Sequence, residues 1–149
     1  MKFATFHDLE DQSVFITGGG AGIGADLTKG FLSQGSKVTF IQRSIPAKFL
    51  IECKGKYKHE PTFLECDVTN TKDLKAALQT TADKQGAISV LVNNAANDTR
   101  HTLGEFTSEQ WDKTMNVNLK PHFFTAQEVA EGMKKMVVDL SLTFRQSHT

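Results

Sequence analysis

The chain has 149 residues, of which 39% are hydrophobic and 23% charged, and this composition predicts one globular domain large enough to bury a core. Its 17 basic residues balance its 17 acidic residues, so the charge gives no reason to expect nucleic acid or an anionic membrane surface as a partner. No apolar run is long enough to span a membrane, and the first residues lack the apolar core of a signal peptide, which favours a cytoplasmic protein.

Strand-like and helix-like patterns alternate along the chain. Short runs rich in β-branched and aromatic residues predict strands at residues 13–17, 37–42, 62–65 and 88–92. Apolar residues at helical spacing predict helices at residues 23–34, 45–57, 71–84 and 108–135, and Pro121 allows a kink in the last. This alternation indicates an α/β fold, a parallel sheet with helices on both faces.

The two cysteines, Cys53 and Cys66, have neither CxxC spacing nor a neighbouring histidine pattern that would suit zinc. We expect both to be reduced thiols and expect no metal site.

Residues 17–24 read TGGGAGIG and fall between the first predicted strand and the first predicted helix. Glycines in such a turn let the backbone approach a pyrophosphate, and the helix N-terminus offers free N–H groups and a partial positive charge. The turn therefore predicts a nucleotide site at Gly18, Gly22 and Gly24; the alternative is a tight loop without a ligand.

This glycine pattern resembles the cofactor loop of the short-chain dehydrogenases, and three more landmarks of that family follow in order. Cys66-Asp67-Val68 follows the third strand, where the family uses an Asp-Val pair to hold adenine. Asn93-Asn94-Ala95-Ala96 resembles the NNAG motif, with Ala96 in place of the glycine. Asn118 falls where the family has the asparagine of its catalytic tetrad. The resemblance covers residues 9–136 and implies these cofactor-binding residues: Gly18, Gly22, Ile23, Gly24, Gln42, Arg43, Asp67, Val68, Asn94 and Ala95.

Each landmark also has a purely structural interpretation. Asp67 can cap or turn the chain before the helix at Thr71. Asn93 and Asn94 can be ordinary loop residues, and Asn118 can face solvent.

The end of the second strand bears on cofactor choice. NAD-dependent members usually carry an acidic residue there, which accepts hydrogen bonds from the ribose hydroxyls. This chain has Gln42 followed by Arg43, so a 2′-phosphate meets no carboxylate and can pair with the guanidinium. The sequence therefore favours NADP over NAD, although Arg43 can also be a solvated loop residue and Gln42 can still bond a ribose.

The stretch NNAANDTRH at residues 93–101 resembles the sugar-oxidising branch of the family, the aldose 1-dehydrogenases. The resemblance implies that Asn97, Asp98, Arg100 and His101 lie near the mouth of a site for a sugar or another alcohol or carbonyl substrate. An ordinary surface loop is the alternative.

The family also needs a YxxxK pair and a serine for proton transfer and substrate orientation. The chain's one tyrosine, Tyr57, is followed four residues later by Pro61 and precedes the third strand, so it does not match that pair. We therefore expect the chain to be the NAD(P)-binding portion of an oxidoreductase, with Asn118 as its one residue of the catalytic tetrad. We also expect the chain to be inactive.

Residues 137–149 read VVDLSLTFRQSHT and depart from the family's continuation of glycines, a fifth strand and a serine loop. Restoring one base after the Met136 codon, with suitable synonymous codons, gives GGGSIINFSSISY, which resembles that continuation. We expect residues 1–136 to be an incomplete dinucleotide-binding domain and residues 137–149 to be a frameshifted tail. A genomic frame without that near-match would contradict this. The alternative is a natural tail in which Val138, Leu140, Leu142 and Phe144 alternate as a strand.

The resemblance further implies the strand order 3-2-1-4, with the fourth strand at an open edge. An uncovered apolar edge favours aggregation and marginal stability. The resemblance also implies that intact members commonly form tetramers through their long helices.

Three functions stay open: an inactive remnant of a sugar oxidoreductase, which we favour, a non-catalytic dinucleotide-binding module, and a helix-mediated interaction module.

Overall fold

The computed structural model describes residues 4–100 and 102–146, and of residues 137–146 it describes the backbone alone. Its strands are β1 (Ser13–Thr17), β2 (Lys37–Gln42), β3 (Thr62–Glu65) and β4 (Val90–Val92). They form one parallel sheet in the order β3-β2-β1-β4, which confirms the predicted strand order.

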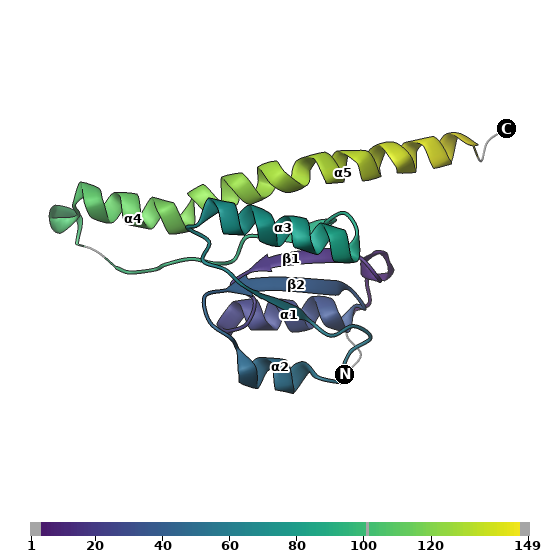
Figure 1. The fold of residues 1–149 in the computed structure, drawn as a ribbon, viewed down its shortest axis with the longest axis horizontal. Coiled ribbons are helices and arrows are strands. Elements are labelled where there is room, and N and C mark those ends of the chain that lie inside the picture. The colour runs from purple at the N-terminus through teal and green to yellow at the C-terminus, as the bar shows by residue number, and fades with distance from the viewer. Residues whose placement is uncertain (1–3, 101, 147–149) are drawn as a thin grey trace.

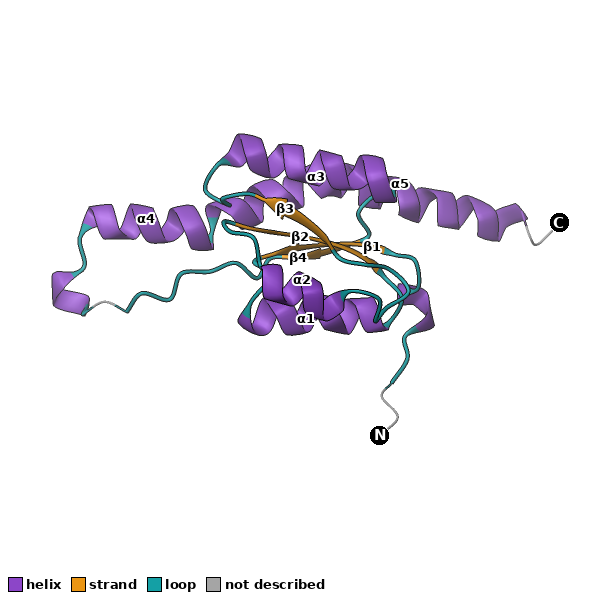
Figure 2. Cartoon of the chain, turned by 60° about the horizontal axis from the view of Figure 1, so that its bottom comes forward, coloured by secondary structure: helices purple, strands orange, loops and turns teal. Residues whose placement is uncertain are grey.

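Helices cover both faces of the sheet, as predicted (Figure 2). The helices are α1 (Gly22–Ser33), α2 (Ala47–Cys53), α3 (Thr71–Gln85), α4 (Ser108–Asn118) and α5 (Lys120–Gln146), with short 3-10 turns at His7–Leu9 and Leu103–Glu105. Helices α1 and α2 lie on one face and α3 and α5 on the other, while α4 extends beyond the sheet (Figure 1). Among the helices that the structure describes, none is long and apolar enough to cross a membrane.

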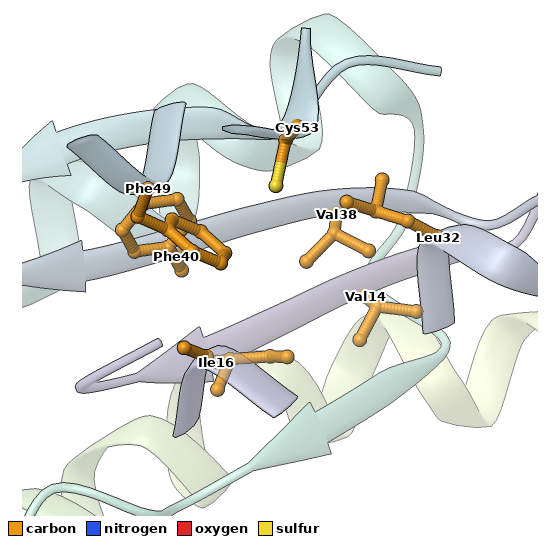
Figure 3. Packing of buried hydrophobic residues seen from close by; sticks show 8 residues of the cluster. Val14, Ile16, Leu32, Val38, Phe40, Phe49 and Cys53 are labelled. Atoms are coloured by element: carbon orange, nitrogen blue, oxygen red, sulfur yellow. The ribbon is translucent and has the colours of Figure 1, made fainter. Parts of the chain in front are cut away.

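The core consists of two apolar layers because side chains alternate between the faces of a strand. Val14 and Ile16 of β1 pack with Phe40 and Phe49 in the layer under α1 and α2 (Figure 3). Phe15 points to the other face, into the layer under α3 and α5. The rings of Phe40 and Phe49 meet edge to face with their centroids 5.6 Å apart, a favoured aromatic geometry.

Strand β1 is buried along its whole length, since β2 and β4 pair with its two edges and helices cover both its faces. Strand β4 pairs only with β1 within the described residues, and its side chains are half-buried. The predicted open edge is therefore present in this structure.

The last helical stretch is divided where the sequence predicts one helix with a kink. Helix α4 ends at Asn118, and Leu119 leaves the helical geometry with φ −125° and ψ −53°. Pro121 lies in the first turn of α5, where a missing N–H breaks no helical hydrogen bond. Thr107 and Gln110 form a capping box that begins α4.

The strand that the sequence offered as an alternative for residues 138–144 does not form, because α5 continues through this segment to Gln146. Apolar residues at positions 133, 137, 140 and 144 also follow helical spacing, and extending an existing helix carries no nucleation cost. Helix α2 and strand β4 also differ from the prediction by two or more residues, while α1 and α3 differ by one. Helix α2 is shorter because Gly55, with φ 68°, turns the chain soon after Cys53, and β4 begins at Val90 rather than at residue 88.

Candidate functional site

A cavity of about 530 Å³ opens at the carboxyl ends of the four strands. Because the strands are parallel, the loops that follow all of them meet at this one edge, where ligands of open α/β sheets usually bind. It gathers eight of the predicted site residues: Gly18, Gln42, Arg43, Asp67, Val68, Asn94, Ala95 and Asn97. Gly22, Ile23, Gly24, Arg100 and Asn118 are not among its lining residues.

The glycine-rich loop brings the start of α1 against the end of β1. Gly24 is buried, and a Cβ at this position would overlap the carbonyl oxygen of Gly18. Ala21 at the N-cap has no side-chain hydrogen bond to the first turn of α1, so the first N–H groups of the helix lack a side-chain cap. Ile23 in the same turn is 76% exposed. This helix end has the polarity and the open N–H groups that suit an anion.

The ends of β1 and β4 are joined by side-chain hydrogen bonds. The Oγ1 of Thr17 accepts from the backbone N–H groups of Asn94 and Ala95, both at 2.9 Å. The Nδ2 of Asn94 donates to the carbonyls of Thr17 at 3.0 Å and Gly18 at 3.1 Å. Asn94 therefore holds the glycine-rich loop in place. The sequence prediction missed Thr17, although its position at the head of the glycine motif was a signal for it.

Gln42 is the last residue of β2 and Arg43 follows it, and both border the cavity. The Oε1 of Gln42 accepts from the N–H of Gly20 at 3.0 Å, and its Nε2 donates to the Ser44 carbonyl at 2.7 Å. Arg43 is exposed at the rim. The end of β2 thus presents a guanidinium and no carboxylate.

Asp67 has the structural role that the sequence left open as an alternative, and it also lines the cavity. Its Oδ1 accepts from the N–H of Thr69 at 2.9 Å and from the Thr69 hydroxyl at 2.8 Å. The backbone hydrogen bond from Thr69 lowers the pKa of the Asp67 carboxyl, and the Arg43 guanidinium contributes in the same direction. The aspartate is therefore ionised at neutral pH, and it turns the chain before α3.

Asn118 is connected to the cavity through Asn97. Its Oδ1 accepts from the Asn97 N–H at 2.7 Å, and its Nδ2 donates to the Asn97 carbonyl at 2.8 Å. The Asn97 side chain in turn accepts from the N–H and hydroxyl of Thr99. Asn97 is thus engaged in a local turn, and Arg100 is exposed. His101, the remaining predicted substrate residue, lies outside the described residues.

A further polar contact ties the fourth loop to α5. The hydroxyl of Thr125 is buried and lies 2.9 Å from the Oδ1 of Asn93 and 2.9 Å from the carbonyl of Pro121. Sequence reasoning did not find Thr125, because a threonine inside a helix carries no local signal for a distant partner. The contact fixes α5 against the end of β4.

Tyr57 packs against the apolar layer under α1 and α2 and is not among the residues that line the cavity. The next two residues, Lys58 and His59, contact the Asp11 carboxylate at 2.8 Å and 2.6 Å. Asp11 lies two residues before β1, so this cluster marks the amino ends of the strands. In the described part of the chain, no group of acidic, histidine or cysteine side chains is arranged to hold a metal ion.

Cys66 is a buried free thiol that lines the cavity. Burial, followed by the charges of Asp73 and Asp67, raises the pKa of the Cys66 thiol to about 11. Thiolate is the reactive form, so we expect iodoacetamide to modify Cys66 slowly in the native protein near neutral pH and faster as the pH approaches 11. Mass spectrometry of the digested protein measures this rate, with urea-unfolded protein as the control. Equal rates in the native and unfolded protein near neutral pH would contradict the buried-thiol assignment.

Residues 12–138 match the family model described as short chain dehydrogenase, and the chain belongs to this family. It is 40% identical over 136 residues to a D-xylose 1-dehydrogenase of Caulobacter vibrioides, covering 91% of this chain and 53% of the relative. It is 38% identical over 132 residues to a probable galactose dehydrogenase of Rhizobium meliloti, covering 87% of this chain and 52% of the relative.

The fold is also similar to that of solved structures. The ligand-free aldohexose dehydrogenase of Thermoplasma acidophilum superposes with a TM-score of 0.72 at 32% identity, covering 86% of this chain and 46% of that one. The chain therefore spans about half the length of the relatives that it matches.

Proposed function

We propose that this chain binds a nicotinamide dinucleotide, NADP in preference to NAD, and that it is the cofactor-binding portion of a sugar-oxidising short-chain dehydrogenase. The observation that carries the proposal is the single cavity that gathers the glycine-rich loop, Arg43, Asp67 and Asn94 at the carboxyl edge of the sheet. When bound, the nicotinamide supplies a hydride acceptor or donor.

We assign different parts of the dinucleotide to different residues of the cavity. The N-terminus of α1, which lacks a side-chain cap, suits the pyrophosphate. Asp67 and Val68 border the half of the cavity next to β3, where the family resemblance assigns the adenine. Asn94 and Ala95 border the half next to β4, and the Asn94 amide holds the glycine-rich loop through the Gly18 carbonyl.

The preference for NADP rests on charge at the end of β2. A 2′-phosphate carries negative charge, and the nearest side chains of that strand end are the neutral amide of Gln42 and the exposed guanidinium of Arg43. Arginine pairs with phosphate through two parallel hydrogen bonds. An acidic residue at this position would instead repel the phosphate.

The sugar substrate is proposed from the named relatives, which include enzymes acting on xylose and galactose. Asn97, Arg100 and His101 are the proposed substrate residues of this chain. Asn118 holds the backbone of Asn97 by two hydrogen bonds, so we assign it the positioning of that loop. Because the sequence contains no YxxxK pair, the chain by itself binds cofactor without turnover.

A fluorescence titration with NADPH and NADH tests the proposal. We expect the chain to bind both, NADPH more tightly by about tenfold, since one exposed arginine–phosphate pair contributes on the order of 1.5 kcal/mol. Arg43→Gln is expected to remove this preference and to leave NADH binding unchanged. Lys84→Gln, on the last turn of α3, is the matched control and is expected to change neither affinity. Absence of binding to both cofactors would overturn the proposal.

A second candidate function, association through the long helices, is favoured by a separate apolar hollow of about 580 Å³ beside the junction of α4 and α5. Leu119 and Phe123 line it and are 60% and 63% exposed. Contiguous exposed apolar side chains typically mark an interface.

We therefore expect the wild-type chain to self-associate and Phe123→Glu to shift it to the monomer, as measured by sedimentation velocity. Lys113→Glu, on the exposed side of α4, is the control. A monomeric wild-type chain at micromolar concentration would rule out association through this surface.

A further inference from the structure

The side chain of Gln42 connects two loops that both border the proposed cofactor site. Its Oε1 accepts from the Gly20 N–H at 3.0 Å, inside the glycine-rich loop. Its Nε2 donates to the Ser44 carbonyl at 2.7 Å, in the turn that follows β2. One amide thus satisfies a backbone donor from one loop and a backbone acceptor from the other.

The glycine-rich loop lies tightly against β2 at this point. Gly20 is buried, and a Cβ there would overlap Gln42 Oε1 and lie 2.8 Å from the Cγ of Pro46. The preceding residue is held as well, since the buried hydroxyl of Thr28 donates to the Gly19 carbonyl at 2.8 Å. The middle of the loop is therefore fixed by contacts within the protein and does not depend on a ligand for its position.

Few side chains can make this connection. Glutamine offers a donor and an acceptor on one planar group at the reach that the gap requires. Glutamate would keep an acceptor for Gly20 but would face the Ser44 carbonyl with a second oxygen. Leucine has a similar volume and offers neither group. The carboxamide of glutamine thus matches its two backbone partners, the Gly20 N–H and the Ser44 carbonyl.

Gln42 also separates two hollows. It lines the dinucleotide cavity together with Gly18 and Arg43, and it lines an adjoining hollow of about 730 Å³ that faces α1 and α2. Its amide lies between them and is already hydrogen-bonded at both ends. The group that the family resemblance assigns to ribose recognition therefore has its nitrogen and its oxygen each bonded to backbone in this chain.

We propose that Gln42 is a positioning residue: one N–H and one oxygen lone pair of its amide clamp the glycine-rich loop to the turn that carries Arg43 and Ser44, so that it acts on the binding of NADP and NAD alike. This inference rests on the proposed function for its ligand, but the clamp itself is a property of the ligand-free protein. The clamp sets the distance between the pyrophosphate loop and the guanidinium.

The experiment compares wild type with Gln42→Leu in two measurements. Without ligand, amide hydrogen exchange of Gly20 should be faster in the variant, because the N–H has lost its acceptor. With ligand, the affinities for NADPH and NADH should both fall by the same factor, about tenfold, so that their ratio is unchanged. Unchanged exchange at Gly20, or loss of NADH binding with NADPH binding intact, would overturn the proposal.

Two further variants keep the test decisive. Gln42→Asn keeps the amide but is one methylene shorter and cannot span both backbone partners, so exchange at the Gly20 amide should be faster than in wild type even if Gln42→Leu does not fold. Gln127→Leu, at an exposed position of α5, controls for the loss of a glutamine elsewhere and should change neither measurement. If wild type binds neither cofactor, the proposed function fails, and the exchange of the ligand-free protein still decides whether the clamp exists.

Discussion

We expect Gly24→Ala to lower the free energy of unfolding by about 2 kcal/mol and to abolish nucleotide binding. A Cβ at this position would overlap the Gly18 carbonyl oxygen, and no flexible side chain can move to make room. The start of α1 must then shift away from β1, and Gly18 is part of the wall of the cavity. Urea unfolding measures the first effect, and NADPH titration measures the second.

Gly30→Ala is the matched control, because Gly30 lies in the same helix and has no heavy atom within 4 Å of its Cβ position. Alanine is the better helix former, so this variant is expected to be more stable than wild type by about 0.5–1 kcal/mol and to bind nucleotide normally. The two substitutions in α1 should therefore change the free energy of unfolding in opposite directions. A Gly24→Ala protein as stable as wild type would contradict the close approach of α1 to β1.

Thr17→Val is expected to destabilise the chain by about 2 kcal/mol or more. Valine has nearly the same shape and suits a buried strand, but it offers no acceptor to the N–H groups of Asn94 and Ala95. Both N–H groups then lose their hydrogen bonds in a half-buried loop, and each such loss costs about 1–3 kcal/mol. The loop after β4 should loosen, and nucleotide affinity should fall with it.

Thr17→Ser distinguishes the contribution of the hydrogen bonds to stability from that of the buried methyl group. The serine keeps the oxygen and removes one buried methyl group, so the expected loss is about 1 kcal/mol. Thermal unfolding of both variants, with nucleotide titration of each, completes the comparison. If Thr17→Ser were destabilised as much as Thr17→Val, the methyl group and not the hydroxyl would hold the two loops together.

Local sequence patterns were sufficient for most of the fold. Strands β1, β2 and β3 have the predicted bounds, and for β1 and β2 the reason is that a buried strand leaves a continuous apolar signal. The bounds of β4 and α2 differed from the prediction, and the tail residues formed a helix where alternation indicated a strand. In the tail the same residues fit two periods and the existing helix decided between them, whereas α2 ends early because Gly55 turns the chain.

The sequence alone determined the family, the sheet with its strand order, and the residues that meet at its carboxyl edge, because these depend on motifs and their spacing along the chain. Only the tertiary structure decided which partners those side chains have within the protein. Gln42, Asp67, Asn97 and Asn118 were predicted to contact cofactor or substrate or to act in catalysis, and each is hydrogen-bonded within the protein. Local spacing carries no information about such contacts, since partners such as Thr17 and Asn94 are brought together only when parallel strands end at one edge of the sheet.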